Sequence, residues 1–151
     1  MAVSSKLAAI WLKRNKRGPM DFHEQATLVA GRGLAGNANQ GGKRQVTILS
    51  AERWQELMQE VGGNLDPSGR RANLLVSGID LENSRKRILL VGNCRLLIQG
   101  ETRPCERMEA AWPGLQAAMR PGWGGGVFAE VLDNGEIKTG DRVSWLNDTS
   151  G

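Results

Sequence analysis

The segment RILLVGNCRLLIQ, residues 87–99, carries the pattern that decides the fold. Its two apolar runs, Arg87 to Val91 and Cys94 to Gln99, have the length of β-strands. The pair Gly92-Asn93 between them is typical of a tight hairpin turn. The segment therefore predicts two neighbouring antiparallel strands.

Short strand-like runs of the same kind lie on both sides of this hairpin. Asp133-Asn134-Gly135 predicts a further hairpin turn between two of them. Many short strands with few helical segments favour a closed or half-closed β-barrel, so we expect a mainly β fold with short helices. The runs are Lys6 to Lys13, Ala26 to Ala30, Gln45 to Leu49, Arg71 to Val76, Val127 to Leu132, Glu136 to Lys138 and Arg142 to Leu146.

Two segments show helical periodicity instead. The first begins after Ser50, a residue type that caps helix N-termini, and ends at Gly62-Gly63. A second, shorter helical segment follows Cys105. The apolar residues that predict one buried face on each segment are Trp54, Leu57, Met58 and Val61 in the first and Leu115, Ala118 and Met119 in the second.

The chain of 151 residues fits one domain with a single core, which we expect to span residues 5–146 and to be followed by a polar tail at 147–151. It has no apolar run of about 18 residues and no signal-peptide pattern, so we expect a cytoplasmic protein. Lys and Arg number 20 against 16 Asp and Glu, and the net charge of +4 favours an anionic partner. Nucleic acid and phosphorylated cofactors both stay open at this point.

Two cysteines are candidates for chemistry. A reducing cytosol keeps such a pair as thiols, and one histidine with two cysteines falls short of the usual four-ligand zinc site. Cys94 opens an apolar strand, so we interpret it as a structural residue. Cys105 follows Pro104 at the expected start of a helix, between Arg103 and Arg107, and this setting favours the thiolate. A thiolate there could bind a soft metal or carry sulfur; a small buried side chain is the alternative.

A glycine-rich stretch, residues 31–44, ends in Lys43-Arg44 and is predicted to form a long exposed loop. Its backbone N–H groups and two cations could hold a phosphate, because glycine lets the backbone approach a ligand closely. The stretch lacks the spacing of a Walker A loop and the strand–GxGxxG–helix context of a dinucleotide site. A flexible surface loop with solvated charges is the alternative.

Arg71 and Asn73 lie at the start of a predicted strand and alternate with Ala72 and Leu74. Successive strand residues point to opposite faces, so we expect the two polar side chains on one face, in a polar patch. Arginine suits bidentate contact with phosphate, although an arginine at a strand start is more often simply solvated.

Five segments occur in order along the chain: GRGLAGN (31–37), RQVT (44–47), RANLLVSG (71–78), GETRPC (100–105) and GD (140–141). Together they resemble the MOSC domain, the family named after the carboxyl-terminal domain of molybdenum-cofactor sulfurase. The likeness covers roughly residues 7–145, and the order of the five segments is more specific than any one of them. The chain resembles a small stand-alone bacterial-type member.

The resemblance implies a MOSC-type β-barrel-like single domain with a cleft for the molybdenum cofactor, a pterin that carries a dithiolene and a phosphate. The family's characteristic cysteine falls on Cys105. It is a molybdenum ligand in reductase-type members and carries a persulfide sulfur in the sulfurase context. Arg71 and Asn73 match cofactor-contacting positions. Further expected cofactor contacts are Lys43, Arg44 and Arg103.

The chain also departs from the family. Related members often have an acidic residue and a histidine where this chain has Asn37 and Asn39, which removes a possible general base from that loop. No aminotransferase-like domain with a pyridoxal phosphate lysine is present in the sequence, so we expect no pyridoxal phosphate site. A sulfur donor would have to be another protein.

Three functions stay open. The leading hypothesis is a molybdenum-cofactor protein that reduces small nitrogen–oxygen compounds with electrons from a separate redox partner, with Cys105 as the metal ligand. The second is a sulfur carrier with a persulfide on Cys105, supplied by a separate desulfurase. The third is a small basic β-barrel that binds nucleic acid, which an aromatic content of 5% and the lack of tyrosine disfavour. No membrane partner is expected.

Overall fold

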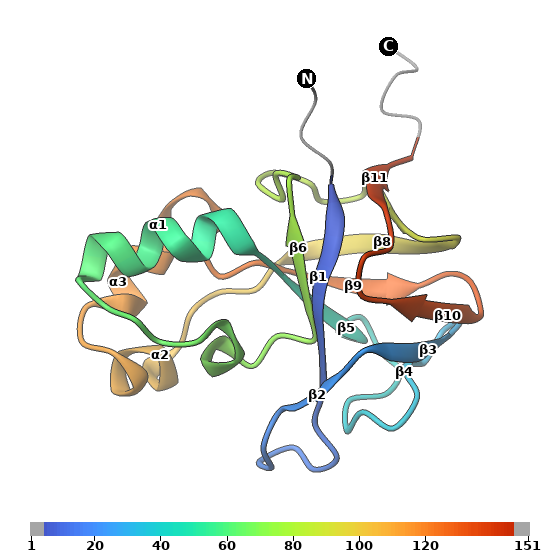
Figure 1. The fold of residues 1–151 in the computed structure, drawn as a ribbon, viewed down its shortest axis with the longest axis horizontal. Helices are drawn as coiled ribbons and strands as arrows, with labels where there is room; N and C mark the ends of the chain where they lie inside the picture. Colours follow the sequence, from blue (N-terminus) through green and yellow to red (C-terminus); the bar gives the residue numbers. More distant parts are fainter. Residues whose placement is uncertain (1–4, 147–151) are drawn as a thin grey trace.

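The computed structural model describes residues 5–146, and the polar tail predicted at 147–151 lies outside them. The chain forms two sheets, one of eight strands and one of three, with three short α-helices gathered on one side of the molecule (Figure 1). Strands outweigh helices throughout, so the prediction of a mainly β fold with short helices is confirmed.

The eight-stranded sheet is antiparallel except for one central pair, β5–β6, which runs parallel. β5 and β6 therefore start at the same edge of the sheet and end at the same opposite edge. In spatial order the strands are β11 (Val143–Trp145), β7 (Ile88–Val91), β8 (Cys94–Glu101), β9 (Val127–Val131), β5 (Val46–Ser50), β6 (Leu74–Ser77), β1 (Lys6–Leu12) and β2 (Asp21–His23).

The three-stranded sheet consists of β10 (Gly135–Lys138), β3 (Gln25–Val29) and β4 (Gly33–Leu34). Its inward side chains pack on one face of the eight-stranded sheet and form the barrel-like core. The ends of the chain close this arrangement, because Leu7 exchanges backbone hydrogen bonds with Gly140 and Asp141 at 2.8 Å each. Ala30 N–H likewise donates to Asn134 Oδ1, 104 positions away.

The predicted hairpin at the opening segment is confirmed. β7 and β8 pair antiparallel, with Val91 opposite Cys94, so Gly92-Asn93 forms the turn. Gly92 has a φ of +59°, a conformation that glycine adopts without steric cost. A side chain on Gly92 would also meet the carboxylate of Asp141, so this turn favours glycine twice over.

Helix α1 (Ala51–Val61) matches its predicted boundaries. The Ser50 hydroxyl accepts from the N–H of Arg53, a cap that stabilises a helix by about 1 kcal/mol, and Gly62 ends the helix in the left-handed conformation. Trp54, Leu57 and Met58 bury their side chains against the outer face of the sheet, as the periodicity predicts.

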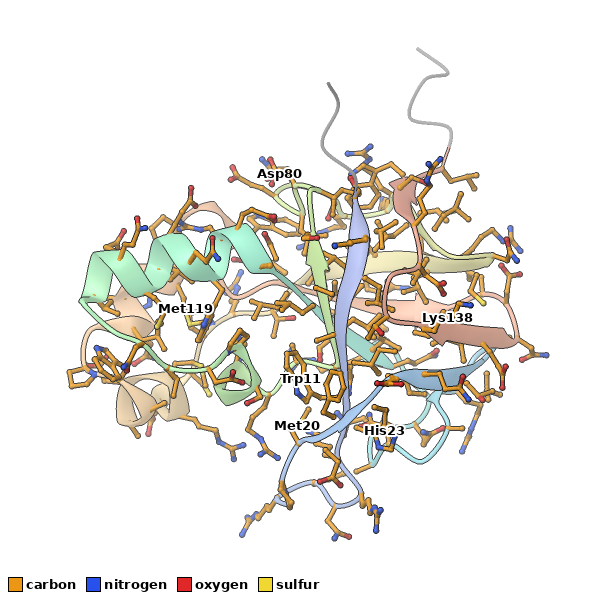
Figure 2. The ribbon with its side chains drawn as sticks, in the orientation of Figure 1. Trp11, Met20, His23, Asp80, Met119 and Lys138 are labelled. Carbon is orange, nitrogen blue, oxygen red and sulfur yellow. The ribbon has the colours of Figure 1, made fainter. Side chains whose placement is uncertain are left out.

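Helices α2 (Glu106–Ala111) and α3 (Leu115–Met119) form a second apolar core together with α1 and this face of the sheet. The chain also has two 3₁₀ turns, η1 (Pro67–Arg70) and η2 (Pro121–Trp123), and Trp123 packs on the barrel core. Figure 2 shows Met119 of α3 within this helical layer. Leu115, Ala118 and Met119 are buried, as predicted. No helix within residues 5–146 is long and apolar enough to cross a membrane.

Three local predictions are wrong. The turn at 133–135 does not join a hairpin, because β9 pairs in the large sheet while β10 pairs with β3 in the small one. The strand predicted from Arg71 begins only at Leu74, because Arg71 ends η1 with a φ of +66°. The stretch 31–44 is not one exposed loop, because Gly33 and Leu34 form β4 and lie buried against β3.

Candidate functional site

A pocket of about 200 Å³ lies where β5 and β6 start, and we name it the cysteine pocket after Cys105, which lines it. Thr47 and Asn73, at the starts of these two strands, belong to its wall. Its most distinctive feature is charge, because five cationic side chains and no carboxylate line it. They are Lys13, Arg44, Arg70, Arg71 and Arg107.

Cys105 lies between β8 and α2, at the N-cap position of α2, as its sequence context predicted. Cys105 is exposed to solvent, and its side chain makes no capping hydrogen bond. Helix α2 has only six residues, so its dipole is weak and the cations of the pocket dominate the electrostatics. The site therefore presents a thiol that solvent and ligands can reach.

Arg70 is the buried cation of the pocket. Its Nε donates to the carbonyl of Gly125 at 3.1 Å and its Nη2 to the carbonyl of Thr102 at 3.3 Å. Burial lowers the pKa of Arg70, Cys105 opposes this shift by attraction, and Arg44 adds to it by repulsion. Arg70 thus joins the segment just before Cys105 to the glycine-rich segment at Gly125.

Lys13 follows the end of β1 and is half-buried in the same pocket. Burial lowers the pKa of Lys13, and repulsion from Arg71, Arg107 and Arg44 lowers it further. The pocket therefore concentrates positive charge at a cost to the folded protein. An anion bound there would relieve that cost.

Arg71 links the pocket to the basic loop after β1, which carries Lys13, Arg14, Lys16 and Arg17. Its Nη2 donates to the carbonyls of Lys16 at 3.2 Å and Gly18 at 2.7 Å. These bonds hold the guanidinium in place, while its Nε is buried without a hydrogen-bond partner. The free Nε is a donor that a ligand in the pocket could use.

Asn73 organises the wall of the pocket. Its Oδ1 accepts from the backbone N–H of Thr47 at 3.1 Å, and its Nδ2 donates to the carbonyl of Trp11 at 3.1 Å and to Oδ1 of Asn37 at 3.2 Å. Asn37 also accepts from the N–H of Lys13 at 3.0 Å. Asn73 and the Oδ1 of Asn37 thus join β1, β5 and β6, while the Nδ2 of Asn37 is buried without a hydrogen-bond partner. Asn39 lines the pocket as well.

Thr102 gives the clearest sign of a missing partner. Its residue is only 7% exposed, it lines the pocket, and its hydroxyl has no hydrogen-bond partner. Leaving such a group buried and unpaired costs about 1–3 kcal/mol. Gly125 lies beside it without room for a side chain, since a Cβ there would overlap the carbonyl oxygen of Thr102. The Thr102 hydroxyl, the free Nε of Arg71 and the surrounding cations therefore fit an anionic ligand with oxygen acceptors.

The donor set does not fit a metal held by protein side chains alone. Within residues 5–146, no three His, Cys, Asp or Glu side chains gather into a possible metal site. A single thiol such as Cys105 suits a soft metal whose other ligands arrive with a cofactor. The residues present therefore fit the cofactor that the family resemblance implies.

The pocket collects four of the six residues expected from the sequence, namely Arg44, Arg71, Asn73 and Cys105. Lys43 and Arg103 are exposed and do not line it, so their roles stay predictions. Lys13, Arg70 and Thr102 were not expected in the site, and Arg107 was expected only as a cation that favours the Cys105 thiolate. Arg70, Thr102 and Arg107 each lie within two residues of an expected site residue, and Lys13 belongs to the basic loop after β1, so proximity was the available signal.

Cys94 contrasts with Cys105. It is 2% exposed within the barrel core, which agrees with its interpretation as a structural residue. Burial raises the pKa of the Cys94 thiol, and the carboxylates of Asp133 and Asp141 raise it further. Its thiolate is therefore disfavoured.

A β-barrel-like domain with a cationic pocket around one accessible cysteine is the class of protein that these observations define. The sequence model of the MOSC domain matches residues 33–144, and the chain belongs to the MOSC domain family. This family is linked to molybdenum-cofactor binding or sulfur transfer. No curated protein sequence matches the chain.

Solved structures agree with the fold. The YuaD protein of Bacillus subtilis aligns with a TM-score of 0.78 at 21% identity, covering 93% of this chain and 94% of that one. YiiM of Geobacillus stearothermophilus aligns with a TM-score of 0.76 at 14% identity, covering 94% of this chain and 75% of that one. YiiM of Escherichia coli gives 0.69 at 14% identity, with 93% and 69% covered. The chain is thus similar to YuaD over nearly its whole length, and the prediction of a MOSC-type fold is confirmed.

Proposed function

We propose that this MOSC-domain protein binds the molybdenum cofactor in the cysteine pocket and reduces small nitrogen–oxygen compounds. The observation that carries the proposal is the convergence of an accessible thiol, five cations and an unpaired buried hydroxyl in one pocket. A phosphorylated cofactor with a thiolate-seeking metal needs these groups together.

The division of labour follows from the chemistry of each side chain. Arg44, Arg71 and Lys13 would pair with the phosphate, the Thr102 hydroxyl would donate to an oxygen of the cofactor, and Cys105 would ligate molybdenum. At about 200 Å³ the pocket is smaller than the roughly 300–1,000 Å³ that encloses a drug-sized ligand. We therefore expect it to hold only part of the cofactor.

When bound, the cofactor supplies two-electron chemistry that no side chain can perform. In the overall reaction an N–OH group becomes N–H, its oxygen leaves as water, and two electrons and two protons are consumed. The electrons come from a separate redox protein.

Molybdenum content tests the proposal directly. The full chain is made in a host that synthesises the cofactor, and molybdenum per protein is measured for the wild type, Cys105→Ser and Cys94→Ser. We expect Cys105→Ser to lose most of its metal and Cys94→Ser to keep it. Equal metal content in wild type and Cys105→Ser, or no molybdenum in any of them, contradicts the proposal.

A sulfur carrier is the second candidate, favoured by the exposure of Cys105 and its lack of a capping hydrogen bond. In this function the Cys105 thiolate attacks the terminal sulfur of a persulfide on a separate desulfurase. The donor's thiolate leaves, and Cys105 carries the persulfide. Mass spectrometry after incubation with a cysteine desulfurase and cysteine would show one added sulfur on Cys105 and none on Cys94.

Both functions need a reduced thiol, which is consistent with a cytoplasmic setting. A protein that holds neither molybdenum nor a persulfide, yet binds oligonucleotides with a steep dependence on salt, would support the nucleic-acid alternative instead.

A further inference from the structure

A hollow larger than the cysteine pocket lies away from Cys105. It is a cleft of about 680 Å³ at the edge where β5 and β6 end, and we name it the acidic cleft. Ser50, the last residue of β5, and Gly78, which directly follows β6, belong to its wall. In Figure 2, Asp80 of this cleft lies at the upper end of the molecule, whereas Trp11, two residues before Lys13 in sequence, lies in the lower half.

Carboxylates dominate the charge of this cleft. Four of them, Glu52, Glu56, Asp80 and Glu82, line it beside a single guanidinium, that of Arg53. The guanidinium is already engaged, since it pairs with Glu56 at 3.3 Å and donates to the carbonyl of Pro121 at 3.2 Å. The cleft therefore keeps a negative excess.

The four carboxylates differ in how far they are satisfied. Both oxygens of Glu52 accept from the N–H of Gly78 at 3.1 Å, and Oδ1 of Asp80 accepts from the N–H of Glu82 at 2.9 Å. Within residues 5–146 the Glu82 carboxylate has no hydrogen bond or ion pair, and its Oε1 lies close to Gly122 on the opposite wall. Glu82 and the second oxygen of Asp80 are thus available to a ligand.

The wall between the carboxylates is apolar. Ile79, Leu81, Pro121 and Trp123 line it, and Ile79 and Trp123 also pack on the barrel core, which fixes their positions. An indole face beside carboxylates attracts organic cations through its quadrupole and through the opposite charges. An inorganic ion fits less well, because no group of three metal-ligating side chains is present in residues 5–146.

We infer that the acidic cleft is a second binding site, and that it takes a small organic cation with an apolar body, such as a substituted ammonium or guanidinium compound. The volume is in the range of small-molecule sites, the walls supply apolar contact, and the carboxylates supply complementary charge. The inference does not rest on the proposed molybdenum function, since neither Cys105 nor any cation of the cysteine pocket lines this cleft.

Three probes with the same aromatic body and different charge test the inference. They are benzyltrimethylammonium, benzyl alcohol and benzylsulfonate, each titrated into the full chain. The readout is the NMR signal of the Trp123 indole N–H, assigned by its absence in Trp123→Phe. We expect saturable shifts of this signal, with affinity falling from cation to neutral compound to anion and at least about tenfold between the first and the last.

Matched variants sharpen the result. Asp80→Asn/Glu82→Gln should weaken binding of benzyltrimethylammonium about tenfold, leave benzyl alcohol unchanged, and leave molybdenum content unchanged. Glu60→Gln removes a carboxylate of α1 that lies outside the cleft and should change none of these. Unfolding temperature confirms that each variant is folded. Equal affinity for all three probes, an unshifted Trp123 signal, or full cation affinity in the double variant would overturn the inference.

Discussion

The cysteine pocket and the acidic cleft lie at opposite ends of the same two parallel strands and carry opposite charge. The pocket gathers five cations where β5 and β6 start, and the cleft gathers four carboxylates where they end. The protein's net charge of +4 reveals neither, because the two sites partly cancel in the sum. The comparison teaches that this fold separates positive and negative side chains to opposite ends of the β5–β6 pair.

A single glycine-rich segment separates the two sites. Gly124 and Gly126 line the acidic cleft, and Gly125 lines the cysteine pocket. Side chains at these three positions would overlap backbone atoms of neighbouring segments. The backbone can therefore run between two ligand sites only because it carries no side chains.

Among the changes that test this contrast, Arg70→Ala should have the largest effect, and the effect is on stability. This change removes two hydrogen bonds from buried carbonyls, those of Gly125 and Thr102, and each group left unpaired costs about 1–3 kcal/mol. We expect the free energy of unfolding in urea to fall by about 2–6 kcal/mol. Arg103→Ala removes an exposed arginine nearby and should stay within about 0.5 kcal/mol of wild type. Similar losses in both variants would show that Arg70 does not join the two segments.

Arg44→Ala compared with Lys43→Ala tests whether the cysteine pocket attracts anions by position rather than by net charge. Both changes remove one cation from neighbouring positions, but only Arg44 lines the pocket. A charge-assisted hydrogen bond contributes about 1.5–3 kcal/mol, so Arg44→Ala should weaken phosphate binding about tenfold or more. Calorimetric titration with phosphate provides the measurement. An equal loss of phosphate affinity in Lys43→Ala would show that net charge, and not position in the pocket, causes the effect.

The two cysteines should also differ, in the rate at which each thiol reacts. Cys105 is exposed in a cationic site, whereas Cys94 is buried and its pKa is raised. Iodoacetamide near neutral pH should therefore label Cys105 at least about tenfold faster, read by mass spectrometry of timed samples. Bound molybdenum should protect Cys105. Faster labelling of Cys94 in the folded protein would reverse the assignment.

The smallest expected effect is that of Lys13→Met. Because the pKa of Lys13 is lowered in the fold, the unfolded chain binds more protons between the folded value and 10.5, and wild-type stability rises with pH in that window. Lys13→Met should lack this rise and be slightly more stable than wild type at neutral pH, while binding phosphate more weakly. Urea unfolding at neutral and alkaline pH measures the difference. A variant less stable than wild type at neutral pH would contradict the argument that burial and repulsion make the charged Lys13 unfavourable in the fold.

Local signals were enough for part of this architecture. The hairpin of β7 and β8, the boundaries of α1 and the position of Cys105 at a strand-to-helix junction all follow from a few neighbouring residues. The membership of Arg44, Arg71 and Asn73 in one pocket followed from family resemblance and charge rather than from local structure.

The rest depended on contacts between distant segments. The sequence around Asp133 satisfies the rules for a hairpin turn, yet β10 joins β3, because the apolar face of the small sheet has to close the core. Arg70 became a buried residue through carbonyls at Thr102 and Gly125, which no local pattern around Arg70 indicates. The acidic cleft is built from three separate segments, so its carboxylates resemble ordinary surface charges when each is viewed alone.

The joining of the two chain ends sets the order of events during synthesis. β3 can pair with β10 only after residues 135–138 have left the ribosome. The hydrogen bond between Leu7 and Asp141 can form only later still. Until then the edges of β3 and the early apolar strand β1 lack their final neighbours. Contacts so distant in sequence slow folding and leave unpaired strand edges open to aggregation. Folding of this domain therefore cannot be completed before its last strands are synthesised, because its first strands pair with segments near its end.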